Sequence, residues 1–158
     1  MKKGFTLVEI VIVLALMIAV GAVVFSNLGT RKADTDLIAT DQQIGSLLHV
    51  AESNALAQQS DAAWGVYFSN VTSATTTPFY ALFTTSYSTS TIVGSPYLLP
   101  STVSFTTSTL ASGATTSVIF SSISGTASAS MTIGLYMPKQ TAAFSSTISI
   151  ASSGSISY

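Results

Sequence analysis

The sequence contains no cysteine and very little charge. Without cysteine the chain forms no disulfide and no thiolate metal site, and it has no cysteine nucleophile. Only 7% of its 158 residues are charged, against about 25% in an average soluble domain. The formal net charge of -1 provides no strong electrostatic field for nucleic acid or anionic lipid. The composition is therefore not that of an ordinary cytosolic domain.

Catalytic residues are equally scarce. The single histidine, His49, excludes a histidine-rich zinc site. A catalytic His49 would also need acids and a nucleophile nearby, and no Asp or Glu follows Asp61. The many serines include no G-x-S-x-G nucleophile elbow. The sequence therefore favours a protein that is not an enzyme.

The first of three segments is a long apolar run. From Phe5 to Phe25 only Thr6 and Glu9 interrupt the apolar residues. About 20 apolar residues in a helix span the roughly 30 Å core of a bilayer. We therefore expect a transmembrane helix over residues 5–29. Lys2 and Lys3 would hold its start in the cytoplasm, which places the C-terminus outside.

Residues 30–61 form the second segment and hold most of the charge in the chain. Leu37, Ile44, Ala51 and Gln58 recur at intervals of seven, which is the stripe of an amphipathic helix. No strong helix breaker separates this segment from the apolar run. We expect one helix from about Phe5 to about Gln58, with an amphipathic second half that packs against another element.

The third segment, residues 62–158, is rich in serine and threonine, and Lys139 is its only charged residue. Short apolar runs, several of which alternate with Ser or Thr, predict half-buried strands. These runs are Trp64 to Phe68, Phe79 to Phe83, Val103 to Phe105, Val118 to Phe120, Met131 to Met137, Thr147 to Ile150 and Ser155 to Tyr158. The alternative is a disordered or O-glycosylated stalk. We expect an α+β fold in which the long helix packs on a C-terminal antiparallel sheet.

A specific motif begins the chain. Residues 2–9 read Lys-Lys-Gly-Phe-Thr-Leu-Val-Glu and lead directly into the apolar run. This motif resembles the class III signal peptide of type IV pilins and type II secretion pseudopilins. The resemblance implies that a prepilin peptidase removes residues 1–4 by cutting after Gly4 and then methylates the new N-terminus, Phe5. It also implies a pilin-like fold and assembly into a filament.

Glu9 is the assembly residue that this resemblance implies. On insertion scales, placing a carboxylate inside a membrane-spanning helix costs about 3 kcal/mol, so the carboxylate needs a partner. In a filament Glu9 of one subunit could pair with the Phe5 ammonium of its neighbour, because a paired buried charge is much less costly than a lone one. The alternative is that Glu9 reaches the membrane interface of a plain signal anchor.

The globular part resembles the GspH/FimT group of minor pseudopilins and minor pilins. The resemblance rests on the helix end from Ala51 to Gln59, on Trp64 to Phe68, and on a closing hairpin from Ile148 to Ile156. Major pseudopilins bind calcium through acidic C-terminal loops, and this chain has no acidic residue there, so no metal or other cofactor is expected. Lys139 alone offers little for DNA phosphates, so nucleic acid is not an expected partner.

The resemblance implies a structural subunit of a type IV pilus or a type II secretion pseudopilus, and the GspH/FimT group implies a minor subunit. Its expected partners are prepilin peptidase, other pilin or pseudopilin subunits, the inner membrane and the assembly platform. Its expected location is the cytoplasmic membrane as a single-pass protein, followed by an extracellular or periplasmic filament. A major pilin and a plain membrane-anchored surface or adhesin domain remain as alternatives.

Overall fold

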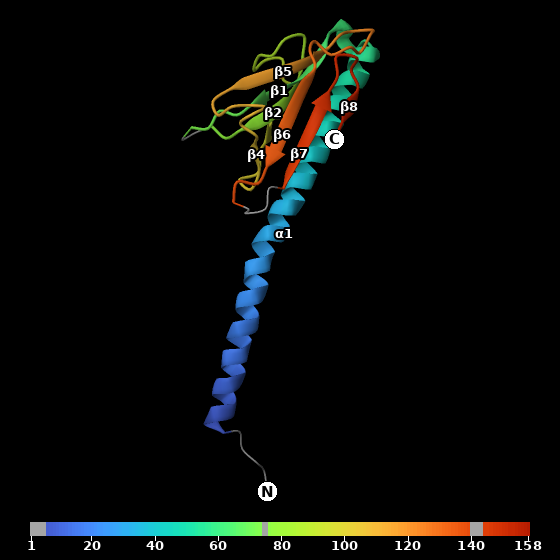
Figure 1. Cartoon of the computed structure of the whole chain (residues 1–158). Helices are drawn as coiled ribbons and strands as arrows, with labels where there is room; N and C mark the ends of the chain where they lie inside the picture. Colours follow the sequence, from blue (N-terminus) through green and yellow to red (C-terminus); the bar gives the residue numbers. More distant parts are fainter. Residues whose placement is uncertain (1–5, 74–75, 140–143) are drawn as a thin grey trace.

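A single long helix dominates the computed structural model, which describes residues 6–73, 76–139 and 144–158. Helix α1 runs from Leu7 to Leu56 over 50 residues, or about 75 Å at 1.5 Å per residue. Its side chains are described outside residues 23–30. The first half of α1 projects away from the strands, which all gather around the second half (Figure 1). The helix ends where Gln58 adopts a left-handed φ of 52°, and the short 3-10 helix η1 (Gln59–Asp61) follows.

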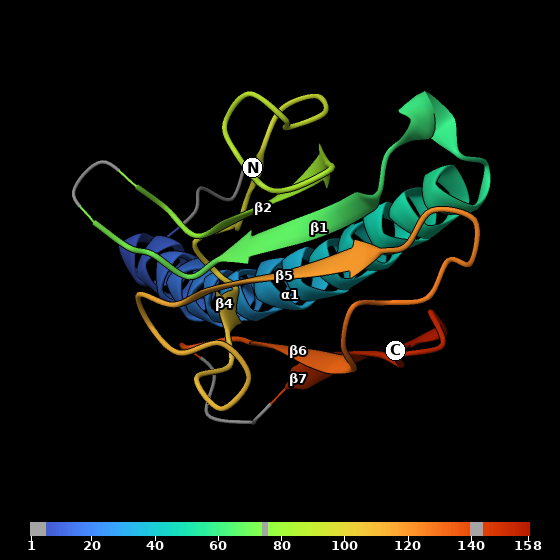
Figure 2. The same cartoon turned by 90° about the horizontal axis from the view of Figure 1, so that it is seen from above.

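The strands form two antiparallel sheets of four strands each. The first sheet has the order β3-β2-β1-β5 and consists of Tyr97–Leu98, Phe79–Thr84, Trp64–Ser69 and Thr115–Phe120. The second has the order β4-β6-β7-β8 and consists of Ser104–Phe105, Met131–Tyr136, Ser145–Ile150 and Ile156–Ser157. Viewed from above, the two sheets lie side by side along one flank of α1 (Figure 2).

The core lies between the second half of α1 and both sheets. Ile44, Leu48 and Ala51 are fully buried on the helix. They meet apolar side chains that alternate along the strands, namely Val66, Phe68, Val118, Phe120, Ile133, Leu135, Ile148 and Ile150. The 3–4-residue spacing on the helix and the two-residue spacing on the strands thus bury one face of each element.

Hydrogen bonds from strand and loop residues attach the helix to the second sheet. The Thr102 hydroxyl, next to β4, donates to Asp36 Oδ2 at 2.6 Å. The Ser146 hydroxyl on β7 donates to Asp41 Oδ1 at 2.8 Å. The charge of the amphipathic segment therefore serves partly to hold the serine- and threonine-rich strands against α1.

The fold class predicted from the sequence is wrong on two points. The predicted transmembrane half is not found: within the described residues, no helix is long and apolar enough to cross a membrane. The predicted single sheet is instead two sheets, because β5 ends the first sheet and β6 pairs with β7 and β4. Alternation predicts which residues form strands, whereas the partner of each strand depends on the connecting loops.

Candidate functional site

The exposed surface of the first half of α1 is almost entirely apolar. The five consecutive residues Ile10 to Leu14 are between 45% and 56% exposed, so apolar side chains face every side of the helix. The same holds from Leu7, which is 79% exposed, to Val20, which is 64% exposed. A stretch of this size without cover is characteristic of a surface that binds another molecule.

Glu9 is the only charged residue on this surface, and it takes part in the N-terminal cap of the helix. Thr6 is the N-cap, and its side-chain oxygen accepts a hydrogen bond from the Glu9 backbone N–H at 3.3 Å. In return, Glu9 Oε2 accepts one from the Thr6 backbone N–H at 3.4 Å. This reciprocal pair is a capping box, whose signature Thr-x-x-Glu is present in residues 6–9 and was overlooked in the sequence. Glu9 therefore has a role within its own helix besides the predicted one between subunits.

The other predicted site residues lie outside the described part of the chain. These are Lys2 and Lys3 of the leader, Gly4 at the expected cleavage point and Phe5 at the expected methylated N-terminus. Their predicted roles stay predictions.

His49 contacts two polar groups. Its Nε2 lies 3.1 Å from the Tyr158 hydroxyl, and its Nδ1 lies 3.5 Å from Glu52 Oε2. The Tyr158 ring lies over Gly45, where an added Cβ would come within 2.5 Å of the ring. His49 thus helps to dock the end of the chain on α1. In the described residues, no three His, Cys, Asp or Glu side chains are grouped in a way that could hold a metal ion.

Asn70 begins the pattern Asn-Val-Thr, which matches an N-glycosylation acceptor. Its side chain is 8% exposed, and its amide donates a 2.8 Å hydrogen bond to the carbonyl oxygen of Leu110. The pattern therefore serves a structural purpose, since the amide nitrogen that a glycan would need is buried and engaged.

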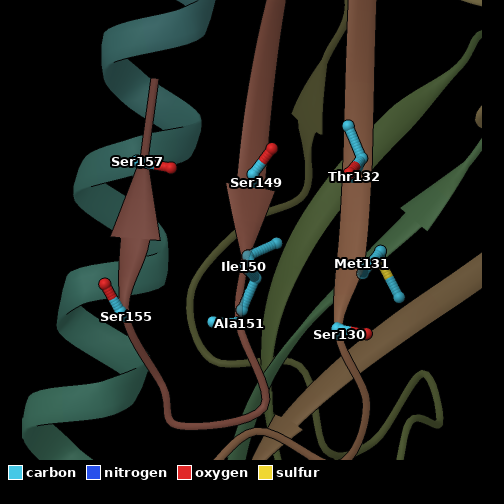
Figure 3. A pocket seen from close by; sticks show the side chains of 8 residues that line it. All are labelled: Ser130, Met131, Thr132, Ser149, Ile150, Ala151, Ser155 and Ser157. Atoms are coloured by element: carbon cyan, nitrogen blue, oxygen red, sulfur yellow. The ribbon is translucent and has the colours of Figure 1, made fainter.

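A cavity of about 330 Å³ opens on the second sheet where β6 begins and β7 ends. Figure 3 shows its lining residues on β6, β7 and β8 and in the turns beside them. They are Ser130, Met131, Thr132, Ser149, Ile150, Ala151, Ser155 and Ser157. None of them is charged. The sequence offered no signal for this cavity, because it depends on the pairing of three strands.

Comparison with known proteins finds no match: neither a family model, nor a curated protein, nor a solved structure matches the chain.

Proposed function

We propose that this chain is a non-catalytic structural subunit of a type IV pilus or a type II secretion pseudopilus. The observation that carries the proposal is the apolar surface from Leu7 to Val20, which is exposed on every side of α1. Burying apolar surface is the main driving force of association between proteins. When copies of this helix, or the helices of related subunits, bundle at the centre of a filament, they bury the apolar surface on every side.

The arrangement of the helix and the sheets suits this role. All strands lie around the second half of α1, so the first half is accessible to neighbours along its length (Figure 1). A filament built in this way buries the apolar halves and leaves the sheets outside. Within the family, the lack of acidic residues after Asp61 favours a minor subunit of the GspH/FimT kind over a calcium-binding major pseudopilin. The filament would stand in the periplasm or outside the cell.

The motif of residues 2–9 supplies the second support. It is followed at once by the exposed apolar surface, as prepilin processing requires if the mature chain keeps its helix. The expected partners are prepilin peptidase, which would cut after Gly4 and methylate Phe5, and the other subunits and assembly platform of the filament.

The test is terminal mass spectrometry of the protein recovered from filaments sheared off the source cells. The expected result is a mature chain that begins with methylated Phe5. Val13→Lys should reduce the amount in the sheared fraction, because it places a charge on the surface that bundles. Ile38→Lys is the matched control, since Ile38 is also exposed, at 58%, but lies beside the sheets. An intact leader, or equal loss for both variants, would contradict the proposal.

A further inference from the structure

We propose that the cavity on the second sheet is a binding site for a neutral carbohydrate chain. The proposal starts from the composition of the cavity. Its polar side chains are the hydroxyls of Ser130, Thr132, Ser149, Ser155 and Ser157, and the exposed Ala151 and half-buried Met131 add apolar surface. Each hydroxyl both donates and accepts hydrogen bonds, which matches the hydroxyls of a sugar. Apolar surface beside a few polar groups is the usual composition of a small-ligand site.

Strand pairing arranges three of these hydroxyls in a row. Thr132 on β6 lies opposite Ser149 on β7, and Ser149 lies opposite Ser157 on β8. Neighbouring strands are about 4.8 Å apart, so the row presents a hydroxyl at each step across the sheet. Figure 3 shows the three side chains at one level on their strands. A linear ligand can lie across the strands and meet them in turn.

The hydroxyls of the cavity are not used inside the protein. None of the five forms a side-chain hydrogen bond with another residue in the described ranges 6–73, 76–139 and 144–158. On β7, by contrast, the Ser146 hydroxyl is engaged, since it donates to Asp41 Oδ1. The five cavity hydroxyls are thus free to bind a ligand.

The lining of the cavity has no charged side chain, which disfavours charged ligands. A phosphate, a carboxylate or a charged peptide would gain little here, because no lining residue is charged. Lys139, the only charged residue after Asp61, follows the opposite end of β6. The ligand that fits is therefore polar and uncharged.

The position of the cavity leaves it accessible in a filament. Ser155 follows Gly154, which lies against Gly125 and the Glu52 side chain near the C-terminal end of α1. The apolar surface proposed for bundling lies at the other end of the helix (Figure 1). Binding at the cavity does not depend on filament assembly, so the two proposals can fail separately.

The experiment is an NMR titration of the full chain in a detergent that has no sugar headgroup. The probes are neutral linear hexasaccharides of glucose and of N-acetylglucosamine, with a galacturonate hexasaccharide of the same length as the charged control. The expected result is that one or more neutral probes shift the amide signals of Thr132, Ser149 and Ser157, and that the acidic probe does not.

Two matched variants locate the binding. Thr132→Val removes a cavity hydroxyl and keeps the shape of the side chain, so the dissociation constant should rise about five- to tenfold. Thr147→Val makes the same change at an exposed position of β7 outside the cavity and should leave the constant unchanged. The proposal is overturned if no neutral probe shifts these signals, if the acidic probe binds as well, or if both variants bind like the unaltered chain.

Discussion

The hydroxyl of Tyr80 on β2 donates a 2.7 Å hydrogen bond to the side-chain oxygen of Gln43 on α1. Tyr80 is 1% exposed, and its ring stacks on Tyr97 with 5.5 Å between the centroids. Burial, and secondarily the nearby Tyr97, raise the pKa of Tyr80 to about 12. The contact thus joins the helix to the first sheet through a phenol that must stay protonated.

Alkaline pH should therefore destabilise the domain. The unfolded chain loses the Tyr80 proton near its ordinary pKa of about 10, whereas the folded chain keeps it until about pH 12. The contribution of Tyr80 to stability is fully present below pH 10 and falls between pH 10 and 12, by about 2 kcal/mol. Urea unfolding across this range measures it.

Tyr80→Phe separates the titration from the packing. It should cost about 1 kcal/mol at neutral pH through the lost hydrogen bond and should flatten the decline above pH 10. Tyr136→Phe is the control, because the Tyr136 hydroxyl has no hydrogen-bond partner among the described residues. An alkaline decline that is equally steep in the Tyr80 variant would contradict the assignment.

Asp34 and Asp36 lie two residues apart on α1 but differ in their partners. Asp36 Oδ2 accepts the 2.6 Å bond from Thr102, whereas Asp34 Oδ1 is buried and has no hydrogen-bond partner among the described residues. Removing a bonded charged acceptor costs about 1.5–3 kcal/mol, whereas removing an unsatisfied one relieves a penalty. We expect Asp36→Ala to lower the midpoint of thermal unfolding and Asp34→Ala to leave it unchanged or raise it. If both variants lower the midpoint of thermal unfolding equally, the two carboxylates do not differ in their contribution to stability.

Gly65 is required by the close approach of β1 to its neighbours. An added Cβ would clash with the backbone oxygen of Val118 and lie 2.8 Å from Phe83 Cζ. Neither the paired strand nor the buried ring can move away freely, so Gly65→Ala should cost about 1–3 kcal/mol of unfolding free energy. Gly21→Ala has nothing within 4 Å and should not change the unfolding midpoint of the domain. Denaturant titration of the two variants checks the difference.

Much of the local structure could be predicted from the sequence, because periodicity reports burial directly. Leu37, Ile44 and Ala51 recur at seven and are buried on α1. Gln58 continues the pattern in the sequence but lies beyond the helix, since its φ of 52° reverses the chain. Strand β3 was missed because Tyr97–Leu98 is only two residues long and has no alternation to detect.

The arrangement of the strands and the cavity could not be predicted in this way. Val118 and Ile133 lie in similar short apolar runs, yet they belong to different sheets. The row of Thr132, Ser149 and Ser157 arises only from the register between β6, β7 and β8. Serines and threonines are common throughout this chain, so no single one of them is conspicuous before the strands are paired.

Variants can separate the two contributions of Glu9, which are the cap of its own helix and the predicted charge pair between subunits. Glu9→Gln keeps an acceptor for the Thr6 N–H, as capping boxes with glutamine do, but removes the charge. Thr6→Ala keeps the charge but removes the N-cap, which costs the helix start about 1 kcal/mol. If Glu9 pairs with the expected Phe5 ammonium of a neighbouring subunit, Glu9→Gln and Glu9→Leu should both deplete the protein from sheared filaments relative to the cell pool.

Thr6→Ala should assemble nearly as well as the unaltered chain, because fraying of one helical turn leaves the carboxylate available. The depletion in Glu9→Gln and Glu9→Leu follows from the cost of leaving an ammonium unpaired among apolar helices. Cleavage after Gly4 should continue in all three variants, since residues 1–5 are unchanged, and terminal mass spectrometry checks this. If Glu9→Gln enters filaments normally while Thr6→Ala does not, the carboxylate acts as a helix cap and the pairing between subunits is wrong.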